Sequence, residues 1–152
     1  MSYRKMGPKL AGLCRHERGQ ALVELAVITP ILLLLIAGII EAGRAFYTYV
    51  QLANASREGG RYGMLSPTDA SGITSSVGRE LPSWITGATT AATCAAAGTN
   101  TFATCNTSTN ARSGDQLKVT VNYNYTPIMP FLNGIGSFTA VTMSTSAIMP
   151  IP

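Results

Sequence analysis

Residues 25–40 read LAVITPILLLLIAGII, sixteen positions without a formal charge. Counted from Gln20, the stretch has 21 residues, and as a helix it would extend about 30 Å, enough to cross the hydrocarbon core of a bilayer. A secretory signal would need a small-x-small cleavage site after this stretch, and IIEAGRAF supplies only a poor one. A buried helix would need apolar segments to cover it, and the chain has few. We expect a transmembrane helix over about 20–41, with a kink at Pro30.

The excess positive charge of the chain lies immediately before this stretch. Only 12% of the 152 residues are charged, and the formal net charge is +4. Residues 1–19 contain five basic side chains and one acidic one, whereas residues 20–152 are formally neutral. A nucleic-acid interface would instead distribute basic residues over a folded face. The distribution is typical of a leader that stays in the cytoplasm, and it predicts a single-pass membrane protein with an exported C-terminal domain.

The helical pattern continues beyond the apolar stretch, so we expect one helix over residues 20–63. Phe46, Tyr47 and Tyr49 fall where an aromatic belt at the outer interface would lie. The expected apolar stripe recurs at three- and four-residue spacing and consists of Ala42, Ala45, Phe46, Tyr49, Leu52, Ala53 and Ser56. The four-residue spacing of Ala55, Gly59 and Gly63 favours a close helix contact, whereas Gly59-Gly60 favours fraying. The sequence leaves both open.

Residues 18–25, RGQALVEL, resemble the cleavage signal of type IV prepilins. The resemblance implies that a prepilin peptidase cuts after Gly19, which would make Gln20 the first mature residue. Glu24 would then lie one helical turn from the new terminal amine. Because a carboxylate inside a bilayer costs a few kcal/mol, an intramembrane Glu24 indicates a function. The resemblance implies pairing with the amine of an adjacent subunit, and the simpler alternative is a carboxylate at the inner headgroups.

A longer segment, residues 18–63, closely resembles the TadE-like family of tight-adherence (Flp) pilus proteins. The shared pattern is RGQ-A-x-VE, a proline within the leucine run, G-x-x-E-x-G-R, and a closing A-x-REG-x-RY. The matching positions in the later motifs are Glu41, Gly43, Arg44, Arg57, Glu58, Gly59, Arg61 and Tyr62. The resemblance implies a pseudopilin or minor pilin, with other pilins or pseudopilins, inner-membrane assembly proteins and the lipid bilayer as partners. Gln20 would be the first mature residue, where ordinary type IV pilins have Phe or Met. Leu25 follows Glu24, where the major fibre subunit of these pilus systems typically has Tyr.

Residues 64–152 are expected to form a small exported domain. A short helix is predicted over Ile73–Ile85, and the Thr- and Ala-rich residues 86–113 read as a flexible loop. Alternating apolar and polar residues predict strands over about 116–126 and 138–149, paired antiparallel. The apolar connection 127–135 is expected to pack against the helix, with membrane or partner contact as alternatives. The predicted fold class is α+β, a long N-terminal helix followed by this domain.

The cysteines outside the leader are predicted to form a disulfide. Cys94 and Cys105 are eleven positions apart, too far for a C-x-x-C redox or metal motif, and the expected topology places them in an oxidising compartment. Cys14 lies in the leader. The only histidine of the chain is His16, also in the leader, so the mature chain would lack the usual general base. We therefore expect no enzymatic activity, no cofactor and no metal site.

Two hypotheses remain from the sequence. The first is a pilin-like subunit that is cleaved after Gly19 and enters or initiates a fibre. The second is an uncleaved single-pass scaffold, whose exported domain binds other secretion or pilus components without entering a fibre.

Overall fold

The structure is a computed structural model that describes residues 14–128 and 140–152 of the chain. The residues separate into two units, an N-terminal unit of residues 1–40 and a C-terminal unit of residues 41–152. The helix α1, Cys14–Leu65, contributes to both units. Its length contains the predicted helix over 20–63.

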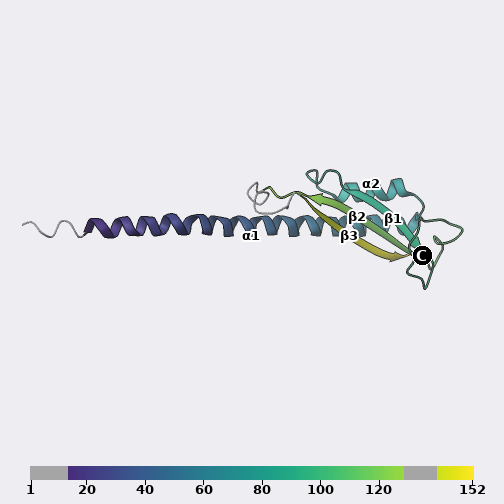
Figure 1. Cartoon of the computed structure of the whole chain (residues 1–152). Coiled ribbons are helices and arrows are strands. Elements are labelled where there is room, and N and C mark those ends of the chain that lie inside the picture. Colours follow the sequence, from purple (N-terminus) through teal and green to yellow (C-terminus); the bar gives the residue numbers. More distant parts are fainter. Residues whose placement is uncertain (1–13, 129–139) are drawn as a thin grey trace, which may run out of the picture. The chain divides into compact units, whose positions relative to one another are not determined.

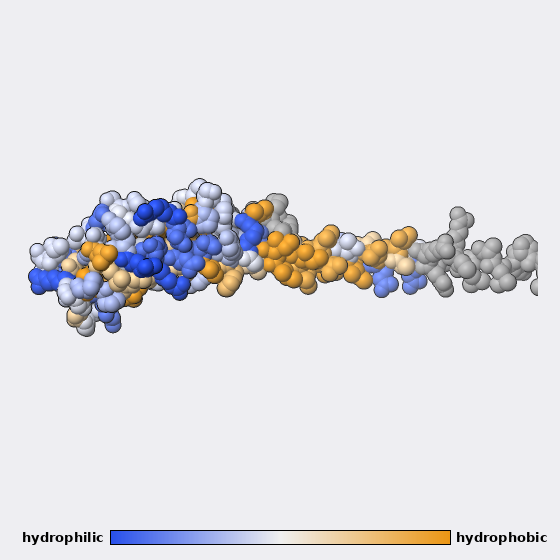
Figure 2. Space-filling view, turned by 180° about the vertical axis from the view of Figure 1, so that it is seen from behind, coloured by the Kyte–Doolittle hydropathy of each residue, from blue (hydrophilic) through white to orange (hydrophobic). Residues whose placement is uncertain are grey.

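In the N-terminal unit, α1 carries large apolar side chains on every side. No residue in the most apolar part of the helix is buried, and Figure 2 shows this part as a band of hydrophobic surface. The helix is long and apolar enough to cross a membrane. Thr29 donates its hydroxyl hydrogen bond to the Leu25 carbonyl at 2.7 Å, so this polar group is satisfied within the helix. Pro30 lies inside α1, and the kink there stays a prediction.

The C-terminal unit consists of residues 41–65 of α1, a second helix and a three-stranded antiparallel sheet. The helix α2 spans Ala70–Glu80, and the strands are β1 (Thr89–Ala95), β2 (Gln116–Tyr125) and β3 (Val141–Pro150). The spatial strand order is β1-β2-β3, so β2 is central (Figure 1). The α+β class, with a long N-terminal helix, a short second helix and antiparallel strands, is confirmed.

Both helices pack on one face of the sheet, because alternate residues of β2 join a single core with them. Leu117, Val119 and Val121 are fully buried, and the intervening residues of β2 are partly exposed. They share the core with Ile73 and Val77 of α2 and with Leu52 and Ala55 of α1. Cys94 of β1 lies opposite Leu117 in the register and is buried in the same core.

The buried face of α1 agrees with the predicted apolar stripe only in part, since Leu52 and Ser56 are buried as expected and the aromatic members are not. Phe46 is 70% exposed and Tyr49 is also exposed, whereas Thr48, which the stripe left out, is buried. Small or polar residues dominate the buried face, which consists of Glu41, Thr48, Leu52, Ala55, Ser56, Gly59, Gly60 and Gly63. Thr48 and Ser56 can be buried because their hydroxyls donate to helix carbonyls at 2.9 Å. Small side chains let the helix approach the sheet closely, and the bulky aromatic residues are left outside.

The second helix begins and ends earlier than the predicted Ile73–Ile85. Asp69 is its N-cap and accepts a hydrogen bond from the Gly72 amide, so the helix begins at Ala70. Leu81 is extended because it precedes Pro82, and this ends the helix at Glu80.

The predicted loop over 86–113 contains a strand that the sequence analysis missed. Thr89–Ala95 form β1, which pairs along its whole length with β2. The sheet therefore has three strands rather than the predicted pair. Most of the connection 127–135 and the start of the strand predicted from 138 lie outside the described residues, so the expected packing of that connection stays a prediction.

Candidate functional site

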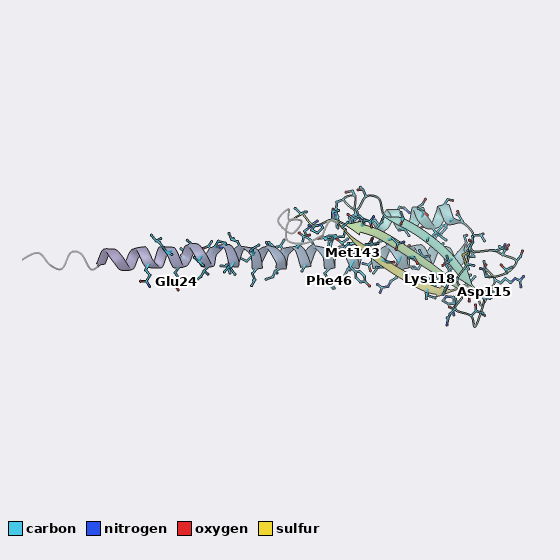
Figure 3. All side chains as sticks on the ribbon, in the orientation of Figure 1. Glu24, Phe46, Asp115, Lys118 and Met143 are labelled. Atoms are coloured by element: carbon cyan, nitrogen blue, oxygen red, sulfur yellow. A yellow bond between two sulfur atoms is a disulfide. The ribbon has the colours of Figure 1, made fainter. Side chains whose placement is uncertain are left out.

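The proposed cleavage site lies on an open part of α1. Gly19 and Gln20 are exposed, and a Cβ added to Gly19 would meet nothing within 4 Å. Glu24 is also exposed, one turn further along, and Figure 3 shows it on the surface of the helix. Among residues with described side chains, Glu24 has no ion-pair partner. The segment leaves both the backbone to be cut and the carboxylate accessible.

The first motif of the C-terminal unit forms a cluster of three side chains, which we call the Glu41 cluster: Glu41, Arg44 and Tyr125. Glu41 is 8% exposed, and one of its carboxylate oxygens lies 2.9 Å from Nη1 of Arg44. The Tyr125 hydroxyl donates a hydrogen bond to the same oxygen, although the two residues are 84 positions apart. The Arg44 guanidinium carbon also lies 5.5 Å from the centre of the Tyr125 ring. The cluster ties the last residue of β2 to α1.

Electrostatics keep Tyr125 in the protonated form that the cluster needs. Burial and the hydrogen bond to Glu41 raise the pKa of Tyr125 to about 12, and the nearby Arg44 opposes this shift. The phenol therefore remains a donor to Glu41 at neutral pH. The second carboxylate oxygen of Glu41 is buried without a partner among the described residues, so losing either donor would leave the carboxylate poorly compensated.

Gly43 of the same motif is exposed, and a Cβ there would meet nothing within 4 Å. It lines a groove of about 430 Å³ together with Arg44, Tyr47, Thr48 and Trp84. Tyr47 and Trp84 stack, with their ring centres 6.0 Å apart.

The glycine of the closing motif is required by packing. A Cβ on Gly59 would lie 2.5 Å from Cγ2 of Val77 and 3.3 Å from Cγ1 of Val119. One turn later, a Cβ on Gly63 would lie 2.4 Å from Cδ2 of Leu117. The helix continues through Gly59-Gly60 to Leu65, so the close-contact interpretation is correct and fraying is not seen.

Tyr62 of the closing motif supports the start of α2. Its hydroxyl donates to Oδ2 of Asp69 at 2.7 Å, while Ser71 and the Gly72 amide donate to Oδ1. The Ser71 hydroxyl, the Gly72 amide and then Tyr62 hold the pKa of Asp69 at about 2, and the same bond raises the pKa of Tyr62. Tyr62 is thus a structural residue of the C-terminal unit.

The charged residues of the closing motif lie on the surface, and within the described part of the chain they pair along their own helix. Arg61 lies 3.5 Å from Glu58, and Nη1 of Arg57 donates to Asn54 at 3.4 Å. Exposed pairs of this kind contribute at most about 1 kcal/mol to stability. Arg57 and Arg61 therefore have little structural role in the C-terminal unit, and they are accessible to another molecule.

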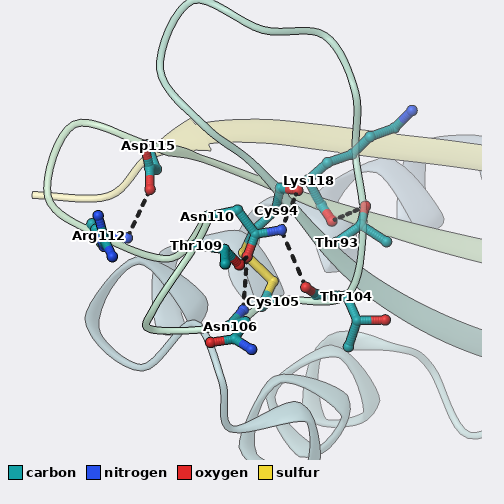
Figure 4. The surroundings of a disulfide bond; sticks show 10 residues. All are labelled: Thr93, Cys94, Thr104, Cys105, Asn106, Thr109, Asn110, Arg112, Asp115 and Lys118. Carbon is teal, nitrogen blue, oxygen red and sulfur yellow. Dashed lines mark hydrogen bonds between the residues drawn. A yellow bond between two sulfur atoms is a disulfide. The ribbon is translucent and has the colours of Figure 1, made fainter.

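The predicted disulfide between Cys94 and Cys105 is present and joins β1 to the loop that follows it (Figure 4). Within that loop, the Asn110 side-chain amide donates to the carbonyls of Cys94 and Thr104 at 3.1 and 3.2 Å. Asp115 accepts from the backbone amides of Arg112 and Ala97, and these bonds lower its pKa. The disulfide and these hydrogen bonds hold the loop against the sheet.

Sequence reasoning missed three residues of these contacts, Tyr125, Asp69 and Asn110. For Asp69 a signal existed, because an aspartate after Ser-Pro-Thr and before a helical pattern is a usual N-cap. Tyr125 bonds to Glu41, which is far away in the sequence, and Asn110 bonds to backbone carbonyls. No local sequence pattern identifies either residue. Within the part of the chain that the structure describes, no cluster of His, Cys, Asp or Glu could hold a metal ion.

The comparisons with known proteins agree with this layout. A family model described as TadE-like protein matches residues 19–61, which run from the proposed cleavage site past Glu41 and Arg44 to Arg61 of the closing motif. No curated protein and no solved structure matches the chain. The family implies a role in tight-adherence pilus assembly and is typically structural rather than enzymatic. Together with the exposed apolar part of α1, the family match indicates a membrane-anchored protein. Residues 19–61 of this chain are therefore similar to the TadE-like family, and they include the helix segment that is long and apolar enough to cross a membrane.

Proposed function

We propose that the chain is a pseudopilin-like protein of a tight-adherence pilus system, cleaved after Gly19 by a prepilin peptidase and required to assemble or initiate the pilus. The observation that carries the proposal is one continuous helix with two different surfaces. Its first part presents an apolar surface with an accessible Gly19 and Glu24, and its second part is built into a folded unit. A subunit that enters an assembly through an exposed N-terminal helix has this design.

The chemistry of Glu24 supports a role in assembly. Cleavage after Gly19 would create an amine at Gln20, four residues before the carboxylate. A carboxylate within the bilayer is costly unless a positive group compensates it. In an assembly, the terminal amine of a neighbouring subunit would supply that charge. The pairing would favour helices that are in register, so Glu24 would select correctly placed partners among other pilins or pseudopilins.

The basic leader sets the proposed topology. Its positive charge would keep the N-terminus in the cytoplasm of an inner-membrane protein, and the C-terminal unit would be exported. The disulfide supports this orientation, because such bonds persist in oxidising compartments. The remaining proposed partners are the peptidase at the cytoplasmic face and the inner-membrane proteins that assemble the pilus.

Replacement of Glu24 tests the role in assembly. In cells that lack the native copy, Glu24→Gln should insert into the membrane normally and fail to restore pili, because the amide carries no charge. Glu80→Gln is the matched control, since Glu80 is exposed on α2 outside the family motifs. Carbonate extraction measures insertion, and electron microscopy measures pili. Normal piliation by an inserted Glu24→Gln protein would refute the proposal and favour the uncleaved scaffold.

A further inference from the structure

The C-terminal unit exposes aromatic side chains at the end that carries the Glu41 cluster. We call Phe46, Tyr47, Tyr49 and Trp84 the aromatic collar. Trp84 comes from the segment after α2, yet it stacks on Tyr47 of α1. Trp84 is the single tryptophan of the chain, and its side chain is 47% exposed. Large aromatic side chains of this kind are usually buried in a core or placed against a partner or a membrane.

The collar lies next to the apolar stretch along the chain. The apolar stretch ends at Ile40, and Phe46 is six residues beyond Ile40, which corresponds to about 9 Å of helix. The headgroup layer on each side of a bilayer core is about 5–8 Å thick. If the apolar stretch fills the core, the Cα atom of Phe46 lies just beyond the headgroups, and those of Tyr47 and Tyr49 lie about 1.5 and 4.5 Å further along the axis. Helical side chains lean towards the N-terminus, so these rings reach back towards the headgroups. Trp and Tyr prefer this layer because their rings are apolar and their N–H or O–H groups remain hydrated.

The arrangement of the rings favours lipid over a protein partner. At 100° per residue, Tyr49, Phe46 and Tyr47 are spread over about 160° of the circumference of α1, starting at one flank of its buried face. A protein would contact a patch on one side, whereas headgroups surround every exposed side. None of the described residues that line the groove beside Trp84 is acidic. The cation among the described lining residues is Arg44, which pairs with Glu41 through Nη1 and still has a side chain that is 36% exposed, so a lipid phosphate can also contact it.

We propose that this end of the C-terminal unit docks on the phospholipid headgroup layer, with Trp84 as a second anchor supplied by the folded unit. Docking at two points, α1 and Trp84, would limit the freedom of the unit to tilt on its helix. This inference goes beyond the proposed function and needs only membrane anchoring, so it holds whether or not Gly19 is cleaved.

The single tryptophan permits a direct test with the full, uncleaved chain. The protein is reconstituted at low density in phosphatidylcholine vesicles, and in matched vesicles whose acyl chains are brominated close to the glycerol end. Bromine quenches only an indole in or near the bilayer. We expect Trp84 to lose roughly half of its emission in the brominated vesicles, because the indole would lie at the interface. Aqueous iodide should quench it weakly.

The matched control moves the indole to the far end of α1. Leu65 is 79% exposed and lies 24 residues beyond Glu41, about 36 Å along the helix. The double variant Trp84→Phe/Leu65→Trp should be insensitive to bromine and quenched by iodide. If the wild-type protein behaves like this control, Trp84 faces water and the proposal is wrong. Protection from both bromine and iodide would show that protein covers the indole, which would also overturn lipid docking.

Discussion

Residues 20–40 and residues 41–65 belong to one helix, yet they are built for different surroundings. The first part is rich in Leu and Ile, and none of these large side chains is buried. The second part has a buried face of small and polar residues, and its largest side chains point outward. The difference shows that apolar content alone does not mark the part of a helix that forms a protein core. In the C-terminal unit, close approach matters more than bulk, because a core forms only where the backbone can reach the sheet.

The largest expected effect comes from the glycines of the two parts. Gly59→Leu would insert a side chain where even a Cβ lies 2.5 Å from Val77, whereas Gly38 has nothing within 4 Å. Gly59→Leu should therefore destabilise the C-terminal unit by about 3 kcal/mol or more. Gly38→Leu is the matched control and should leave this stability unchanged. Denaturant titration of the detergent-solubilised chain, followed by Trp84 fluorescence, reports on this unit alone. Equal stability of the two variants would contradict the comparison.

The second prediction concerns the disulfide, which stabilises only the folded unit. Cys94→Ala/Cys105→Ala should lower the free energy of unfolding of the C-terminal unit by about 2 to 3 kcal/mol, because the unfolded chain gains freedom. The helicity of residues 20–40 should not change. Cys14→Ala serves as the control, since this third cysteine takes no part in the bond. If Cys14→Ala lowers stability as much as the double variant, or the double variant has no effect, the assigned role of the disulfide is wrong.

The comparison also separates what the sequence predicts from what it does not. Periodicity and charge predict α1, β2 and the anchoring role, because each depends on a local pattern. β1 was missed because its sequence, TTAATCA, has little apolar contrast and becomes a strand through pairing with β2. The predicted stripe of α1 is right for Leu52 and Ser56 and wrong for Phe46 and Tyr49, which hydrophobicity alone places inside. The buried positions depend on distances to Val77, Leu117 and Met149 that a local pattern does not contain.

The smallest expected effect on stability comes from the hydrogen bond between Tyr125 and the buried Glu41. Tyr125→Phe removes a donor from Glu41 and should cost about 1 to 2 kcal/mol of stability at pH 7. Because the pKa of Tyr125 is raised from 10.0 to about 12, the folded state holds its proton longer than the unfolded state. The associated stability is present below pH 10 and is lost as the pH rises towards 12.

The alkaline loss should therefore be smaller in Tyr125→Phe than in the wild-type protein. Tyr49→Phe is the control, because Tyr49 is exposed, and it should keep the wild-type pH profile. Unfolding midpoints between pH 9 and about 12 measure the difference. An unchanged profile in Tyr125→Phe would show that the Glu41 cluster does not link β2 to α1 as described. Glu24→Gln, in the other part of the helix, should leave all of these midpoints unaltered.

The division of α1 has its clearest consequence at Gly19. If the first part of the helix is a segment for membrane and assembly, the leader before it is removed and Gln20 becomes the first residue. The N-terminal sequence of the protein, taken from cells with and without the prepilin peptidase, tests this directly. We predict a start at Gln20 in the first strain and an intact leader in the second. An intact leader in both strains, or a start at Gln20 in both, would contradict the account.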